Sequence, residues 1–239
     1  MQFKKFMKNW KLNLLAILCI ALLFSLGCWQ LTRSTQKKEL LKSFAGRSLQ
    51  TPLKVKNLQQ EQDLRFYQAE LTGRFDNAHT ILLDNKIFHG QIGYEIYTPF
   101  YASGLTAPIL IDRGFIGIHR SRTERPAIQA IAGRVTMKGM LNLPPKYVAL
   151  GEITDGKPAW PLRVEYIHLA ELSKLMKIPQ LFKYVLILPP KNGTYEVEWQ
   201  VTTITPERHL GYAVQWFALA LTLLILSVVL NFRSFTTQK

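Results

Sequence analysis

Two long, uncharged apolar stretches constrain this chain more than any other feature of its sequence. The first runs from Leu12 to Trp29 and the second from Tyr212 to Leu230. At about 1.5 Å per residue, a helix of either length spans about 27–29 Å, close to the ~30 Å hydrocarbon core of a bilayer. The residues between them are mixed, polar and interrupted by proline and glycine. The sequence therefore predicts a membrane helix, a water-soluble domain and a second membrane helix.

This layout puts both termini on the same side of the membrane. The two tails carry basic side chains and no acidic ones, because all 16 acidic residues lie between the apolar stretches. Basic tails are typical of cytoplasmic ends, so the domain is predicted on the opposite side. The predicted segments are a cytoplasmic tail at 1–11, a membrane helix at 12–29, an extracytoplasmic β-rich domain at 30–209, a membrane helix at 210–230 and a cytoplasmic tail at 231–239.

The stretch around Cys28 is similar to the cleavage site of a lipoprotein signal, but its register is wrong. Such a signal has leucine three residues before the modified cysteine, whereas this chain has Ser25 there and Leu26 one position later. The residues after Trp29 keep apolar positions at helical spacing, which favours an uncleaved helix that leaves the membrane and ends near Gly46. A cleaved lipoprotein or envelope adaptor is the alternative, and an intact mass distinguishes the two.

The domain between the helices is predicted to consist mainly of short strands. Asn192-Gly193 indicates a tight hairpin turn, one helix is expected from His168 to Met176, and residues 119–128 are expected to form an exposed basic loop. The fold-class prediction is an α+β, mainly antiparallel domain, either a sheet or a partly open barrel with one helix. Runs of β-branched and aromatic residues favour strands at 66–75, 81–87, 93–101, 108–118, 133–141, 160–167, 184–190 and 195–204.

The sequence of this domain contains no familiar catalytic motif. There is no nucleophile elbow, P-loop or dinucleotide-binding glycine motif, and no two of the five histidines have the i, i+4 spacing of a helical metal site. Cys19 and Cys28 both lie in the first apolar stretch, so the domain has no disulfide and no zinc motif. The chain is therefore not expected to be an enzyme. Its net charge of +14 does not indicate nucleic-acid binding in a chain anchored twice.

His209 has the most informative position among the histidines, because it directly precedes the second apolar stretch. Spacings of three and seven residues place His209, Tyr212 and Trp216 on one narrow stripe of a helix. Two interpretations stay open: an interfacial aromatic belt with basic anchors, or a haem site with His209 as axial ligand and arginines on the propionates. The topology brings seven residues to one membrane surface: Trp29, Gln30, Arg33, Arg208, His209, Tyr212 and Trp216.

Three stretches of the sequence resemble the surfeit locus protein 1 family of cytochrome c oxidase assembly proteins. They occur in the family's order and with its two-helix layout. Asp112 and Phe115 depart from the family pattern, since asparagine and tryptophan are usual there, and TPERHL replaces an asparagine-rich lead to the histidine. The three stretches are GCWQLTR from Gly27, the pair GYEIYTPF from Gly93 and ILIDRGFIG from Ile109, and HLGYAVQWFALA from His209.

The resemblance implies a non-enzymatic membrane factor for the biogenesis of a haem–copper oxidase. It implies haem a as a transient cofactor, and oxidase subunit I, other assembly factors and the lipid bilayer as partners. The alternative is a scaffold that clamps subunit I without holding haem. A bacterial inner membrane is the expected location, with a periplasmic domain, because the first residues do not resemble a transit peptide. The predicted site consists of His209 as iron ligand, Trp29, Tyr212 and Trp216 as walls, and Arg33 and Arg208 as propionate partners inferred from position alone.

Overall fold

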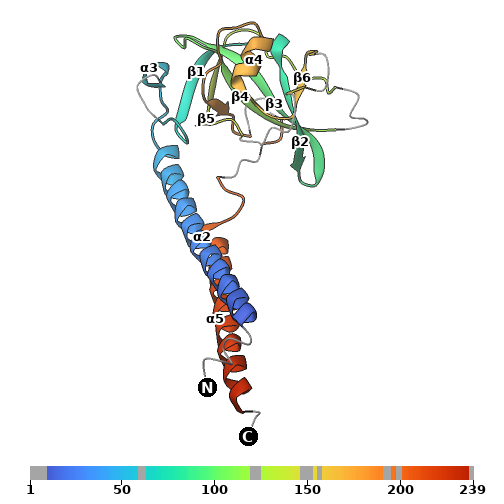
Figure 1. The fold of residues 1–239 in the computed structure, drawn as a ribbon. Coiled ribbons are helices and arrows are strands. Elements are labelled where there is room, and N and C mark those ends of the chain that lie inside the picture. Colours follow the sequence, from blue (N-terminus) through green and yellow to red (C-terminus); the bar gives the residue numbers. More distant parts are fainter. Residues whose placement is uncertain are drawn as a thin grey trace. The chain divides into compact units, whose positions relative to one another are not determined.

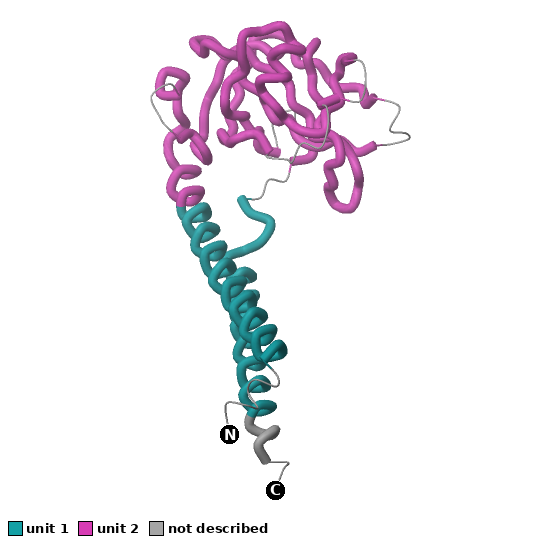
Figure 2. Tube along the Cα trace, viewed as in Figure 1, with its two compact units in different colours: residues 1–42, 200–239 teal, residues 43–199 magenta. Residues whose placement is uncertain are grey.

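The computed structural model describes most of the chain. It divides into two compact units, which Figure 2 colours separately: residues 1–42 together with 200–239, and residues 43–199. The described residues are 10–58, 63–118, 125–145, 153–154, 158–190, 195–197 and 201–236, with the backbone alone for 232–236.

The first unit is built from two long helices, α2 (Trp10–Ser48) and α5 (Pro206–Thr236), which lie side by side in Figure 1. Both are long and apolar enough to cross a membrane, as the sequence predicted. Helix α2 continues past the apolar stretch to Ser48, two residues beyond its expected end at Gly46. The predicted membrane segments at 12–29 and 210–230 stay predictions, because the ends of a helix do not mark a bilayer surface.

Hydrogen bonds between the helices fix them as an antiparallel pair. Asn13 and Asn231 exchange side-chain amide hydrogen bonds of 3.4 and 3.0 Å. Toward the other end of the pair, Ser34 Oγ donates to the carbonyl oxygen of Pro206 at 2.9 Å. Amide and hydroxyl groups are strong partners where water is scarce, so these bonds also fix the register of one helix against the other.

The packing between the helices follows a seven-residue repeat of small side chains. Gly27 and Ser34 are buried on α2, and Ala213 and Ala220 are buried on α5. A repeat of seven keeps one stripe of each helix against its partner, and small residues let two backbones approach closely. At Gly27 the approach is so close that a Cβ atom would lie 2.4 Å from the ring of Phe217.

The second unit is a ring of β-strands. Its strands follow the order β1-β5-β7-β4-β3, and β1 pairs again with β3, which closes the ring. Strands β2 and β6 continue the sheet beyond β3. The β2–β6 and β4–β7 pairs are parallel and the other pairs are antiparallel. The strands are β1 (Gln68–Phe75), β2 (Ile81–Phe88), β3 (Gln91–Ala102), β4 (Ile109–Gly117), β5 (Val135–Asn142), β6 (Leu162–Val164) and β7 (Val185–Ile187).

Alternating burial along the strands creates the core of this ring. In β1, Ala69 and Leu71 are fully buried while Glu70 between them is exposed, as expected for a strand with one face inward. Three short helices complete the described part of the unit: α3 (Val55–Leu58), the 3₁₀ helix η1 (Asn77–His79) and α4 (Leu169–Leu175). The main core cluster includes Leu58, Leu64, Leu71, Phe100, Ile109, Ile111, Leu141, Tyr184, Leu186 and Leu188.

The structure confirms the predicted fold class, with two apolar helices around a mainly antiparallel domain. Helix α4 confirms the helix expected from His168 to Met176. The strand expected at 160–167 is wrong in extent, because only Leu162–Val164 pairs, in parallel with β2. The Asn192-Gly193 turn and loop residues 119–124 lie outside the described residues. Of the last expected strand, residues 195–197 and 201–204 are described, and among them Glu196 forms a bridge to Phe115.

Arg113 is a buried cation inside this unit, at 1% exposure. Its guanidinium carbon lies 5.7 Å from the ring of Phe75 and 5.5 Å from that of Tyr195, and Nη2 donates to the carbonyl oxygen of Gln129 at 2.7 Å. Burial lowers the pKa of this guanidinium from its ordinary value. Aromatic faces attract a cation through their negative π clouds. Arg113 thus connects β4 to β1 and to the two segments that carry Gln129 and Tyr195.

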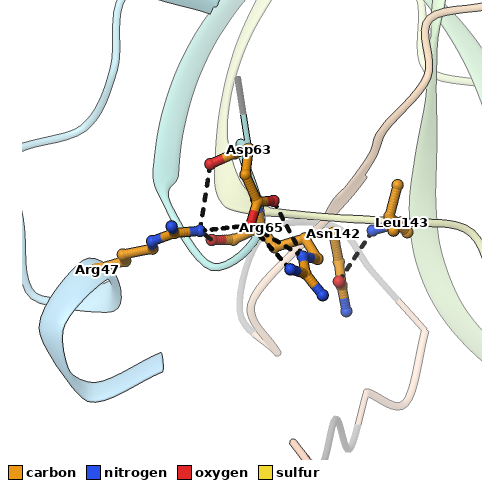
Figure 3. Close-up of polar contacts among 5 residues, drawn as sticks. All are labelled: Arg47, Asp63, Arg65, Asn142 and Leu143. Carbon is orange, nitrogen blue, oxygen red and sulfur yellow. Dashed lines mark hydrogen bonds and ion pairs between the residues drawn. The ribbon is translucent and has the colours of Figure 1, made fainter. Parts of the chain in front are cut away.

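The last turn of α2 is fastened to the ring by Asp63. Figure 3 shows Arg47 and Arg65 converging on this carboxylate: Arg47 Nη1 donates to Oδ2 at 3.0 Å, and Arg65 Nη2 donates to Oδ2 at 2.9 Å. Arg47 Nη1 also reaches the carbonyl oxygens of Asp63 and Arg65. Hydrogen bonds from Arg65 are the largest influence on Asp63, and with those from Arg47 they hold the pKa of the carboxyl well below its usual range.

Replacing Asp63 by asparagine is expected to loosen the last turn of α2. Because the pKa of Asp63 is lowered, its stabilisation is present above the ordinary pKa and is lost as pH falls toward the lowered one. Asp63 and its partners are about one-third exposed, so the loss should be roughly 1 kcal/mol. Hydrogen exchange of the amides after Phe44 measures it. In the control, Glu70→Gln at an exposed ion pair with Lys138, exchange should be nearly unchanged.

Candidate functional site

The first turn of α5 places His209 against α2. Thr205 precedes the helix and accepts hydrogen bonds from it: its hydroxyl from the amide of Arg208 at 3.4 Å, and its carbonyl from that of His209 at 3.3 Å. Pro206 is the first helical residue, where its missing N–H costs no helical hydrogen bond. This start turns the imidazole of His209 inward, and only 7% of the residue is exposed.

The imidazole of His209 meets the side chain of Gln30 across the helix pair. Its Nδ1 lies 2.7 Å from Gln30 Oε1, although the two residues are 179 positions apart in sequence. Ser34 lies one helical turn further along α2 and is bonded to Pro206 in the same turn of α5. Two interhelical hydrogen bonds therefore hold one turn of α5 against two successive turns of α2, and the His209 ring is anchored through one nitrogen.

The other predicted site residues lie around this contact, with different degrees of exposure. The Arg33 guanidinium lies over the Trp29 ring at 5.4 Å, and Arg33 Nη1 donates to Gln36 Oε1 at 3.1 Å. Trp29, Arg33, Arg208 and Tyr212 are exposed, and Trp216 is half-buried. The structure thus joins His209 with Gln30, and Trp29 with Arg33. The binding of a ligand by the six predicted site residues stays a prediction; these residues are Trp29, Arg33, Arg208, His209, Tyr212 and Trp216.

Sequence reasoning placed Gln30 near His209 but did not identify it as the partner of the imidazole. It also missed Ser34 and the Asn13–Asn231 pair. A signal for Asn13 and Ser34 exists in the sequence: seven-residue steps from Asn13 through Gly27 to Ser34 place these residues on one stripe of α2. The stripe was hidden because the apolar stretch has leucine on every face.

A second polar cluster lies in the wall of a cavity of about 160 Å³ in the strand ring. Lys86 Nζ lies 2.6 Å from Glu95 Oε2. Asp112 beside them is buried, and its Oδ1 accepts a hydrogen bond from the Gly114 amide at 3.0 Å. Burial, followed by the charge of Glu95, raises the pKa of Asp112 well above its ordinary value. The other lining side chains are mainly apolar: Ile87, Phe88, Phe115, Ile187 and Val197.

A bare metal ion and a haem iron require different numbers of protein ligands. Among the residues that the structure describes, no three His, Cys, Asp or Glu side chains lie close enough to hold a metal ion together. A haem iron has different needs, because the porphyrin supplies four ligands and the protein supplies one or two axial ones. A single imidazole anchored through Nδ1, as at His209, fits that requirement.

Comparison with known proteins points to one family. The model of the SURF1 family matches residues 17–221. The SURF1-like protein of Rickettsia felis is 27% identical over 231 residues, which cover 92% of this chain and 96% of the relative. The SURF1-like protein of Monosiga brevicollis is 22% identical over 219 residues, covering 87% and 83%. Surfeit locus protein 1 of Xenopus tropicalis is 22% identical over 216 residues, covering 82% and 68%. The chain therefore belongs to the SURF1 family, a family of cytochrome c oxidase assembly factors.

Proposed function

We propose that the helix pair holds haem a for assembly of the oxidase, with His209 as an axial ligand of the iron. The observation that carries this proposal is the contact between His209 and Gln30. A buried imidazole whose Nδ1 is occupied has Nε2 left for a ligand. Bound haem a would supply the iron and the porphyrin that oxidase subunit I requires.

The neighbouring side chains support this proposal through their chemistry. Trp29 offers an apolar face that a porphyrin plane can stack on, with Tyr212 and Trp216 on the α5 side. Arg33 and Arg208 are exposed guanidiniums within one helical turn of Trp29 and His209 respectively. A guanidinium binds a carboxylate through two parallel hydrogen bonds, so both arginines suit the propionates.

The proposed location is supported by the two apolar helices and by the bacterial relatives. We place the two apolar helices in a bacterial inner membrane, with residues 30–209 in the periplasm and both termini in the cytoplasm. The basic, acid-free tails support this orientation. The bacterial SURF1-like proteins among the relatives are compatible with it.

Purification in detergent from cells that synthesise haem a tests the proposal. The wild-type chain should carry a Soret band, and His209→Ala should lose most of it, because the axial bond is lost. His168→Ala is the matched control: His168 is exposed and precedes α4, so its Soret band should equal that of wild type.

The competing function is a scaffold that clamps subunit I and holds no haem. In that case no wild-type preparation would carry a Soret band, whereas subunit I would still co-purify. Equal haem content in wild type and His209→Ala would contradict the assignment of the ligand. Equal recovery of subunit I with both proteins, together with loss of haem from the variant alone, would support it.

A further inference from the structure

We propose that Gln30 is a positioning residue that holds His209 in its Nδ1–H tautomer and thereby makes Nε2 the ligating nitrogen. This inference rests on the proposed haem function and names a residue that controls it. It begins from the 2.7 Å contact between His209 Nδ1 and Gln30 Oε1. A carbonyl oxygen can only accept a hydrogen bond, so Nδ1 must carry the proton in this contact.

The direction of this hydrogen bond decides whether the imidazole can bind iron through its outer nitrogen. When Gln30 accepts from Nδ1–H, the neutral ring has its lone pair on Nε2. If the amide of Gln30 were turned over, its NH₂ group would donate to Nδ1 and the proton would move to Nε2. Nε2 would then have no lone pair for a metal. The orientation of the Gln30 amide therefore decides whether Nε2 of His209 has a lone pair that can bind a metal.

Gln30 shares the task of holding the helices together with other contacts, so the pair does not depend on it alone. Ser34 and Pro206 are bonded in the neighbouring turn, and Asn13 and Asn231 are bonded at the far end of the pair. Small residues bring the helix backbones together between these points. The helix pair should consequently survive substitution of Gln30, while the ring of His209 loses its fixed orientation.

The Gln30 side chain is uncharged, and this also affects how strongly His209 would bind the haem iron. A ligating histidine commonly donates its other N–H to a carboxylate, a carbonyl or water, and a carboxylate makes the ring more basic. An amide oxygen polarises the ring less, so His209 should be a moderate ligand. A moderate ligand suits a protein that must release its haem to another chain.

Substitutions that change only the acceptor test this inference in the full chain reconstituted in detergent with haem a. Gln30→Glu keeps an acceptor and should raise the iron–histidine stretching frequency in resonance Raman spectra. It should also lower the reduction midpoint potential. Gln30→Met keeps the length but replaces the amide oxygen by a thioether, which is only a weak acceptor, so it should lower that frequency and weaken haem binding by about tenfold.

Gln215 provides the matched control on α5. It is exposed, and six residues at about 100° each put it on a different face from His209. Gln215→Glu and Gln215→Met should leave the frequency, the potential and the haem affinity at their wild-type values. If these variants shift the three quantities as much as the Gln30 variants do, the positioning role is refuted.

A measurement without haem separates this inference from the proposed function. The ¹⁵N chemical shifts of the His209 ring in the haem-free chain report the tautomer directly, and Nδ1–H should dominate in wild type. A dominant Nε2–H form would overturn the role of Gln30 whatever the chain binds. Failure of the proposed function looks different: wild type would bind no haem a, or His209→Ala would bind it equally, although the tautomer was as expected.

Discussion

Gly73→Ala is expected to open the strand ring and to be the most destabilising of the substitutions considered for this chain. At Gly73, β1 pairs with Val135 of β5 on one edge and with Ala102 of β3 on the other. A Cβ atom there would lie 2.0 Å from the carbonyl oxygen of Tyr101, which is backbone and cannot turn away. We expect a loss of about 3 kcal/mol or more, in the range of severe backbone clashes.

Thermal unfolding of the full chain in detergent, followed by near-ultraviolet circular dichroism, measures this loss. A destabilisation of about 3 kcal/mol corresponds to a melting temperature roughly 6–12 °C lower for a domain of this size. Gly46→Ala is the control, since no atom lies within 4 Å of a Cβ at that helical position. Alanine favours a helix, so this variant should be neutral or slightly more stable. Equal losses at both glycines would contradict the role of Gly73 in closure.

Asp112→Asn is expected to make the domain more stable at neutral pH. Asp112 is buried beside Glu95, and its pKa is raised by burial and by the charge of Glu95. An asparagine has the same shape, can still accept from the Gly114 amide, and carries no charge to bury. Burying a polar or ionisable group without suitable partners costs roughly 1–3 kcal/mol. We expect the free energy of unfolding of Asp112→Asn near pH 7 to exceed that of wild type by about this amount.

The pH dependence of that gain follows from the direction of the shift. Near pH 3, Asp112 is protonated in the folded and the unfolded chain alike, and the variant and wild type should differ little. As pH rises past the ordinary pKa of about 4, the unfolded carboxyl ionises before the folded one. The wild-type chain therefore loses stability up to the raised folded pKa, whereas the variant does not.

Melting temperatures measured from pH 3 to pH 8 test this prediction. The curves of wild type and Asp112→Asn should separate as pH increases, with the variant higher. Glu165→Gln serves as the control, because Glu165 is exposed and its replacement should leave the curve parallel to that of wild type. Parallel curves for Asp112→Asn as well would show that the buried carboxyl does not titrate unfavourably.

The sequence was sufficient to predict those features that depend on local composition. Two uninterrupted apolar stretches of this length predicted long apolar helices, and both helices are present. Alternating residues in β1 and β5 predicted strands in the correct places. Strand order was out of reach, because β7 has only three residues and its position between β5 and β4 depends on pairing with distant segments.

The sequence predicted which residues of the candidate site lie near one another, but it did not predict which of them are in contact. Topology alone brings Gln30 near His209, because Gln30 directly follows the first apolar stretch and His209 precedes the second, on the same side of the membrane. The hydrogen bond between them depends on the rotation of each helix about its axis, which is set by small residues such as Gly27 and Ala213. Periodicity cannot reveal that rotation when nearly all positions are apolar. Asp112 was noticed as a departure from the family, but only the fold shows that it is buried beside Glu95.

The strand ring has a consequence for the order in which this protein can be made. β7 is the last strand in the chain, yet it stands between β5 and β4, so the ring cannot close until Ile187 has been synthesised. Until then, β5 and β4 have open edges, which favour wrong pairing with other chains. Ribosomes add about 5–20 residues per second, so α5 follows within a few seconds of β7. The domain and the second helix should thus become able to form almost together, and the growing chain needs protection until that moment.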